Sequence, residues 1–185
     1  MTNTAQATAL QTDWHRLSLA ELIQHIECEH HAFLEAAMPR LRQKLVEVIQ
    51  LDCGRNRSLL SELAQVLITM SCELHQHLMK EEDVLFPFII SLETAANRNK
   101  PRPYTPFGEI GNPIHMMESE HDDVLSASIR IRELLGRLAP AKECQIAIQE
   151  FKDQLTRFDQ DINLHTHLEN DILFPKARAL EAKFH

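Results

Sequence analysis

Two stretches of the chain share one pattern, and this pattern decides the fold. Residues 77–87 read His-Leu-Met-Lys-Glu-Glu-Asp-Val-Leu-Phe-Pro, and residues 165–175 read His-Thr-His-Leu-Glu-Asn-Asp-Ile-Leu-Phe-Pro. In both stretches a glutamate follows the histidine by four residues, and Leu-Phe-Pro comes next. Side chains four residues apart lie on one face of a helix, so each stretch presents an imidazole and a carboxylate together. The repeat therefore predicts a duplicated helix pair.

Apolar residues at helical spacing surround both stretches and predict four long amphipathic helices. The first begins at a capping box, Ser18 with Glu21, and Gly54 is its expected stop. The others are expected over residues 58–92, over residues 114–138, and from Pro140 in a first helical turn onward. No strand pattern interrupts them. The expected fold is all-α, an antiparallel up-down four-helix bundle.

The connection between the second and third helices is long. Residues 94–113 hold four prolines and two glycines, which is typical of a loop. A connection of this length is either functional or a plain crossover, and the sequence leaves both readings open. We expect two parts in the chain, an N-terminal segment over residues 1–17 and the bundle over residues 18–185.

Composition excludes several classes of protein. The 185 residues include 27 acidic and 19 basic ones, and the net charge of −8 disfavours nucleic acid and anionic membranes as partners. Four glycines are too few for an all-β fold or a Gly-rich phosphate loop. We expect no signal peptide and no membrane span, because the apolar runs are short. The four cysteines are scattered and indicate reduced thiols in a cytoplasmic protein.

Eleven histidines stand out in this composition, and histidine is the commonest metal ligand. The first helix offers His30 and His31, and the third offers His121. Together with the two repeats, the four helices then supply four histidines and two glutamates. This set holds two metal ions if both carboxylates bridge them along with a solvent-derived oxygen. Mixed imidazole and carboxylate ligands suit iron or manganese, and a remaining open position on each ion suits O₂, NO or peroxide.

The motifs together resemble the hemerythrin-like di-iron domain, and most closely the repair-of-iron-centres (RIC) family. The resembling features are His31-Ala-Phe-Leu34 with Pro39, His77-Leu-Met-Lys-Glu81 with Leu-Phe-Pro87, Met117-Glu-Ser-Glu-His121-Asp122, and His165-x-x-x-Glu169 with Leu-Phe-Pro175. They span roughly residues 18–180. Only about 17 residues precede the first helix, without the small cysteine-bearing domain that is typical of RIC proteins.

The resemblance implies a ligand set and a function. The implied metal ligands are His31, His77, Glu81, His121, His165 and Glu169. The implied cofactor is a pair of iron ions in an oxo- or hydroxo- and carboxylate-bridged centre. The implied function is repair of iron–sulfur clusters damaged by nitrosative or oxidative stress, with damaged iron–sulfur proteins as partners. Whether the protein is an enzyme stays open, since iron donation and NO reduction are both compatible with such a site.

Two alternatives remain. One is a hemerythrin-like sensor or carrier that binds O₂ or NO. The other is a ferritin-like di-iron oxidase, in which Glu27-x-x-His30 and Glu118-x-x-His121 supply ligands together with Glu81 and Glu169. The ferritin-like reading leaves His77 and His165 without a role, so we rank it lower. The two readings differ at the first helix, where the ligand is either His31 or His30.

Several neighbouring residues are expected to play lesser parts. His30 is expected on the flank of the site, and His75 and His167 point away from it because each lies two residues from a ligand. Glu73 and Glu118 either accept hydrogen bonds from ligand histidines or lie on solvated faces. Phe86 and Phe174 are expected to pack beside the site, and Lys80 to be an exposed helix charge.

Overall fold

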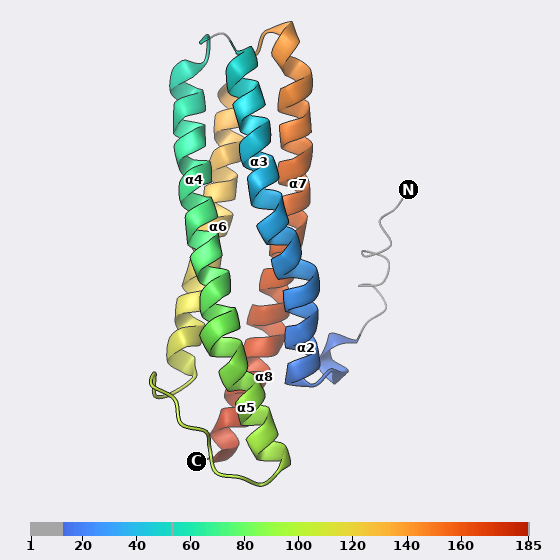
Figure 1. Cartoon of the computed structure of the whole chain (residues 1–185), viewed down its shortest axis with the longest axis vertical. Helices are drawn as coiled ribbons and strands as arrows, with labels where there is room; N and C mark the ends of the chain where they lie inside the picture. Colours follow the sequence, from blue (N-terminus) through green and yellow to red (C-terminus); the bar gives the residue numbers. More distant parts are fainter. Residues whose placement is uncertain (1–12, 53, 185) are drawn as a thin grey trace.

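The computed structural model describes residues 13–52 and 54–184, which form a bundle of four antiparallel helical rods (Figure 1). The rods are made of α2 (Leu19–His25) with α3 (Ala32–Leu51), α4 (Arg57–Lys80) with α5 (Phe86–Asn97), α6 (Gly111–Arg137), and α7 (Gln145–His167) with α8 (Phe174–Glu181). The closest neighbours are α4 with α6 and α3 with α7. Strands are absent from the described part of the chain, so the predicted all-α bundle is confirmed.

Three of the rods change from α-helix to π-helix for a short distance. The π-helical segments are Ile26–His31, Glu81–Leu85 and Leu168–Leu173. A π-helix bonds each N–H to a carbonyl five residues back, so its turns hold more residues, and such segments are frequent at functional sites. The sequence analysis did not anticipate them. The rod of α6 has no such segment between Gly111 and Arg137.

The helix ends agree with the sequence in part. The Ser18 hydroxyl accepts a hydrogen bond from the Glu21 amide, and the Glu21 carboxylate accepts one from the Ser18 amide, so the capping box is confirmed. Gly54 follows the end of α3 with a φ of 82°. The expectation for Pro140 was wrong, because it lies in the connection before a 3₁₀ turn, Lys142–Cys144. The following helix α7 begins only after that turn.

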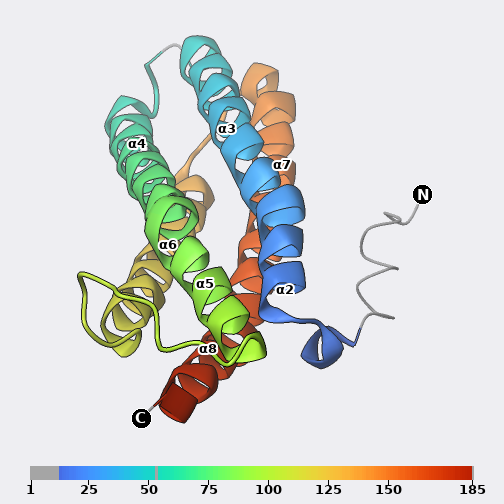
Figure 2. The same ribbon diagram turned by 60° about the horizontal axis from the view of Figure 1, so that its bottom comes forward.

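The connection between α5 and α6 is shorter than predicted and spans residues 98–110. Figure 2 shows it crossing the end of the bundle where α5 and α8 lie. Glu181 of α8 anchors it, because its carboxylate accepts hydrogen bonds from the Arg102 guanidinium at 3.1 Å and from the Ile110 amide at 3.1 Å. These contacts tie the loop to α8 and favour a plain crossover.

The apolar core is divided into two clusters. The upper cluster, toward the top of the bundle as drawn in Figure 1, lies among α3, α4, α6 and α7 and includes Phe151 and Phe158. The lower cluster lies among α2, α5, α8 and the start of α6 and includes Phe86 and Phe174. Each rod passes from one cluster to the other at the residues that carry the predicted ligands. The site is therefore a polar layer between two apolar cores.

Some expectations fall on residues that are not described. The predicted segment 1–17 lies mostly in residues 1–12, and Cys53 is likewise outside the described part. Cys28 and Cys72 are exposed thiols. Within the described residues, no helix is both long enough and apolar enough to cross a membrane.

Candidate metal centre

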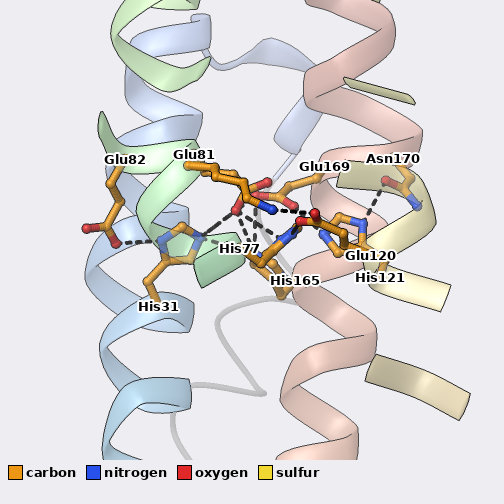
Figure 3. Close-up of polar contacts among 10 residues, drawn as sticks. His31, His77, Glu81, Glu82, Glu120, His121, His165, Glu169 and Asn170 are labelled. Carbon is orange, nitrogen blue, oxygen red and sulfur yellow. Dashed lines mark hydrogen bonds and ion pairs between the residues drawn. The ribbon is translucent and has the colours of Figure 1, made fainter. Parts of the chain in front are cut away.

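The structure brings all six predicted ligand residues together in the polar layer, as Figure 3 shows. The six side chains are His31, His77, Glu81, His121, His165 and Glu169, and each is at most 1% exposed. Every rod contributes at least one of them. Burying this many ionisable side chains in a core costs free energy unless they are paired or bind a metal.

The two repeats supply one histidine–glutamate pair each. On the second rod, His77 Nε2 lies 3.3 Å from Glu81 Oε2. On the fourth rod, His165 Nε2 lies 3.1 Å from Glu169 Oε1. Both pairs sit at the point where an α-helix passes into a π-helical segment. The spacing of four residues therefore does bring each imidazole and carboxylate together, as the sequence predicts.

The six residues form two overlapping groups whose ligand atoms lie within 4.8 Å of one another. One group contains His31 and His165, the other contains His77 and His121, and both contain Glu81 and Glu169. The two oxygens of Glu169 divide between the groups, since Oε1 faces His165 and Oε2 lies 3.0 Å from His121 Nε2. Glu81 Oε2 also lies 3.5 Å from His31 Nε2. Each carboxylate is thus placed to bridge two ions.

The inner atoms of this cluster have almost no hydrogen bonds. Within the described residues, no hydrogen-bond partner is found for either oxygen of Glu81 or Glu169, or for Nε2 of His77 and His121. Buried polar atoms are usually hydrogen-bonded, so this concentration of exceptions needs a physical cause. Two cations, each facing two imidazole nitrogens and two carboxylates, would satisfy all of these atoms. The residues present therefore fit a pair of transition-metal ions.

The outer nitrogens of three histidines of the cluster have hydrogen-bond acceptors that the sequence analysis did not identify. The Nδ1–H groups of His31, His77 and His121 donate to Glu82 at 2.7 Å, Glu120 at 3.0 Å and Asn170 at 3.1 Å, respectively. Such acceptors orient a ligand and fix its tautomer. Each acceptor is adjacent in sequence to a member of the cluster, and this adjacency is the one signal that could have identified it.

Two other residues were weighed as acceptors, and the structure does not use them. Glu118 pairs with Arg178 at 3.2 Å, and Glu73 lines a surface hollow beside Glu120. Lys80 is more than an exposed helix charge, because its ammonium group pairs with the Glu120 carboxylate behind His77.

The carboxylates shift the pKa values of the histidines. Burial lowers the pKa of His31, but Glu169, Glu81 and Glu82 outweigh it and raise that pKa to about 9. Burial acts in the same way on His77, and Glu81, Glu169 and Glu120 raise its pKa to about 9. For His165 burial dominates and lowers the pKa. At neutral pH these raised pKa values favour the protonated imidazolium form of His31 and His77, and a metal that bound there would have to displace one proton from each.

Neighbouring residues lie largely where the sequence placed them. His75 and His167 are exposed. Phe86 stacks on His31 and Phe174 stacks on His121, with ring centroids 5.6 Å and 6.4 Å apart. His30 lies outside both groups and next to His165, as expected of a neighbour that is not a ligand, and its side chain is buried.

The chain is similar in sequence to a known family and to several known proteins. The sequence model of the family described as Hemerythrin HHE cation binding domain matches residues 21–177. The iron-sulfur cluster repair protein YtfE of Citrobacter koseri is 29% identical over 172 residues, covering 93% of this chain and 72% of that protein. A probable iron-sulfur cluster repair protein of Haemophilus influenzae is 31% identical over 170 residues, covering 89% and 67%. A further YtfE, from Dickeya chrysanthemi, is 31% identical over 168 residues, covering 90% and 69%.

Proposed function

The chain belongs to the hemerythrin family of HHE cation-binding domains, and on this premise we propose that it is a non-haem di-iron protein that repairs iron–sulfur clusters. The proposed ligands of one iron are His31 and His165, and those of the other are His77 and His121. Glu81 and Glu169 would bridge the two ions. The observation that carries this proposal is that Glu81 and Glu169 both lie within reach of both buried histidine pairs.

The ligand set favours reactive iron over tightly stored iron. Four protein ligands face each proposed ion, which is fewer than the six of an octahedral site, so NO, O₂ or peroxide has room to bind. A di-iron pair supplies reversible one-electron chemistry and exchangeable iron. The protein's part is to hold it away from bulk water, since every ligand is buried and Phe86 and Phe174 stack on two of the histidines.

The repair role draws on the relatives, which are named as iron-sulfur cluster repair proteins. We propose that this chain supplies iron to clusters that nitric oxide or peroxide has damaged. Damaged iron–sulfur proteins are then its macromolecular partners. We propose that the chain meets them in the cytoplasm.

The first test is metal content. Protein purified without oxygen and reconstituted with Fe(II) should hold about two irons per chain, with near-ultraviolet absorption bands after exposure to air. The matched variants are His77→Ala, which removes a proposed ligand, and His75→Ala, which removes an exposed histidine on the same helix. Loss of iron in His77→Ala alone supports the site. Equal iron in both variants contradicts it.

The second test is repair itself. The iron-loaded protein is mixed anaerobically with a hydratase whose [4Fe–4S] cluster has been damaged by NO, and recovery of hydratase activity is followed. Recovery should exceed that given by an equal amount of free Fe(II) with a chelator present. Recovery equal to the free-iron control would contradict iron donation.

A second candidate function is NO or O₂ binding at the same irons, favoured by the small number of protein ligands. Anaerobic NO added to the reduced protein separates the cases. Nitrous oxide formed over many turnovers indicates an enzyme, and a single stoichiometric spectral change indicates a binding protein. The ferritin-like arrangement is not favoured, because neither Glu27 nor His30 belongs to a ligand group.

A further inference from the structure

The internal repeat extends from the ligands to the residues behind them. Glu82 follows Glu81 and accepts from His31, and Asn170 follows Glu169 and accepts from His121. Glu120 precedes His121 and accepts from His77. In the other half of the bundle, the residue that precedes His31 is His30. The repeat therefore puts His30 where an acceptor for His165 is expected.

The contacts of His30 agree with this position. Its side chain is buried, and its ring centroid lies 6.3 Å from that of His165. Its Nδ1 lies 3.1 Å from Oδ1 of Asp161, which is one helical turn before His165 on α7. Within the described residues, His30 Nε2 and His165 Nδ1 both lack a hydrogen-bond partner. Two buried, unpartnered ring nitrogens thus lie on neighbouring rings.

The chemistry of the two nitrogens is complementary. A histidine that binds a metal through Nε2 carries its proton on Nδ1, so His165 offers a donor toward its outer side. In the neutral form of His30, a carboxylate beside Nδ1 favours the tautomer with the proton on that nitrogen, which leaves Nε2 as an acceptor. Asp161 thereby selects the tautomer of His30 that can receive the His165 proton donor.

We propose that His30, oriented by Asp161, is the positioning residue that accepts the hydrogen bond of His165 Nδ1–H when metal is bound. An aligned N–H···N bond between two imidazoles needs ring centroids roughly 5 Å apart. The rings therefore approach by about 1 Å when metal binds, or one buried water joins the two nitrogens, since buried waters commonly bond to polar groups that lack another partner. The inference rests on the proposed metal site and not on cluster repair.

The test uses the full chain with two substitutions at one position. His30→Glu puts a carboxylate where Glu120 stands in the other half, and His30→Phe keeps a ring but removes the acceptor. Anaerobic Co(II) titration should show metal binding about tenfold weaker in His30→Phe, with most of the loss restored in His30→Glu. If the two variants bind equally weakly, His30 only fills space and the proposal is wrong.

A spectroscopic readout separates positioning from packing. In proton NMR of the Co(II)-loaded protein, the imidazole N–H protons of the ligands give hyperfine-shifted signals that disappear in D₂O. His30→Phe should displace one of these signals and leave the others in place. Asp161→Asn, which changes little volume, should displace the same signal, and this arm serves if His30→Phe fails to fold. An unmoved signal in Asp161→Asn overturns the proposal.

The wild-type titration keeps this inference apart from the proposed function. Metal uptake by the wild type with no difference among the variants removes only the role of His30. No metal uptake by the wild type overturns both.

Discussion

The His77–His121 position and the His31–His165 position share two carboxylates but differ in what lies behind their histidines. His77 is backed by Glu120, itself paired with Lys80, and His121 is backed by Asn170. His31 is backed by Glu82, whereas no direct acceptor is found for His165 within the described residues. The two halves of the repeat share the inner residues of the cluster and differ in the outer residues that accept hydrogen bonds from them. The two proposed irons are therefore not equivalent, although their ligands are chemically the same.

Removing a shared carboxylate should have the largest effect on metal binding, because both positions lose a proposed ligand at once. Glu169→Ala is expected to bind fewer than one metal per chain, and His121→Ala is expected to keep the metal at the His31–His165 position. Metal analysis of the two purified variants measures this directly. If Glu169→Ala still binds two ions, the carboxylate does not bridge.

Substituting the outer acceptors should weaken one position selectively. Glu120→Leu removes the partner of His77 and leaves Lys80 without its carboxylate, so we expect metal binding at that position to weaken by about 10- to 100-fold. Metal release to an excess of chelator should show two phases, one from each position. In Glu120→Leu the phase from the His77–His121 position should be accelerated and the other phase unchanged. Acceleration of both phases would mean that the two positions are not held independently.

The metal-free protein should lose stability as the pH rises. The pKa values of His31 and His77 are raised from 6.5 to about 9 in the folded chain. A raised pKa adds stability that is fully present below about 6.5 and is lost as the pH rises through about 9. The melting temperature of the metal-free protein should therefore fall by several degrees between pH 6.5 and 9. The metal-loaded protein serves as the control, since metal replaces these protons and its melting temperature should change less.

The smallest expected effect comes from making the two halves more alike. Asn170→Asp puts a charged acceptor behind His121, as Glu82 stands behind His31. Charge-assisted hydrogen bonds are stronger than neutral ones, so metal binding at the His77–His121 position should tighten by a few-fold. Competition with a chelator of known affinity measures the change. Weaker binding in this variant would show that the amide is needed for geometry.

The choice of His31 over His30 came from the family resemblance, but the sequence itself was sufficient to predict the bundle and the four residues of the cluster that belong to the repeat. The reason is that a ligand pair four residues apart is a local feature of one helix, and the repeat doubled its weight. The acceptors Glu82, Glu120 and Asn170 were missed because each serves a histidine on another rod. Glu73 and Glu118 had been weighed because they share a helical face with a ligand, but the partner came from across the bundle. His30 is a neighbour of the site, as predicted, but its burial was not predicted for the same reason, since it lies against His165 and Asp161 of α7.

The three π-helical segments have a consequence for anyone who would copy this site into a designed bundle. They lie at the level of the cluster, and the polypeptide continues below them into the lower core. Rebuilding the same sequence with ideal α-helices would remove the wide turns, and one residue of register turns everything beyond by about 100° around the helix axis. Phe86 and Phe174, which begin α5 and α8, would then face away from the histidines on which they now stack. A designer who transplanted only the six cluster residues and their spacing would have every residue present, but on helices that lack the wide turns needed to orient the residues beyond them.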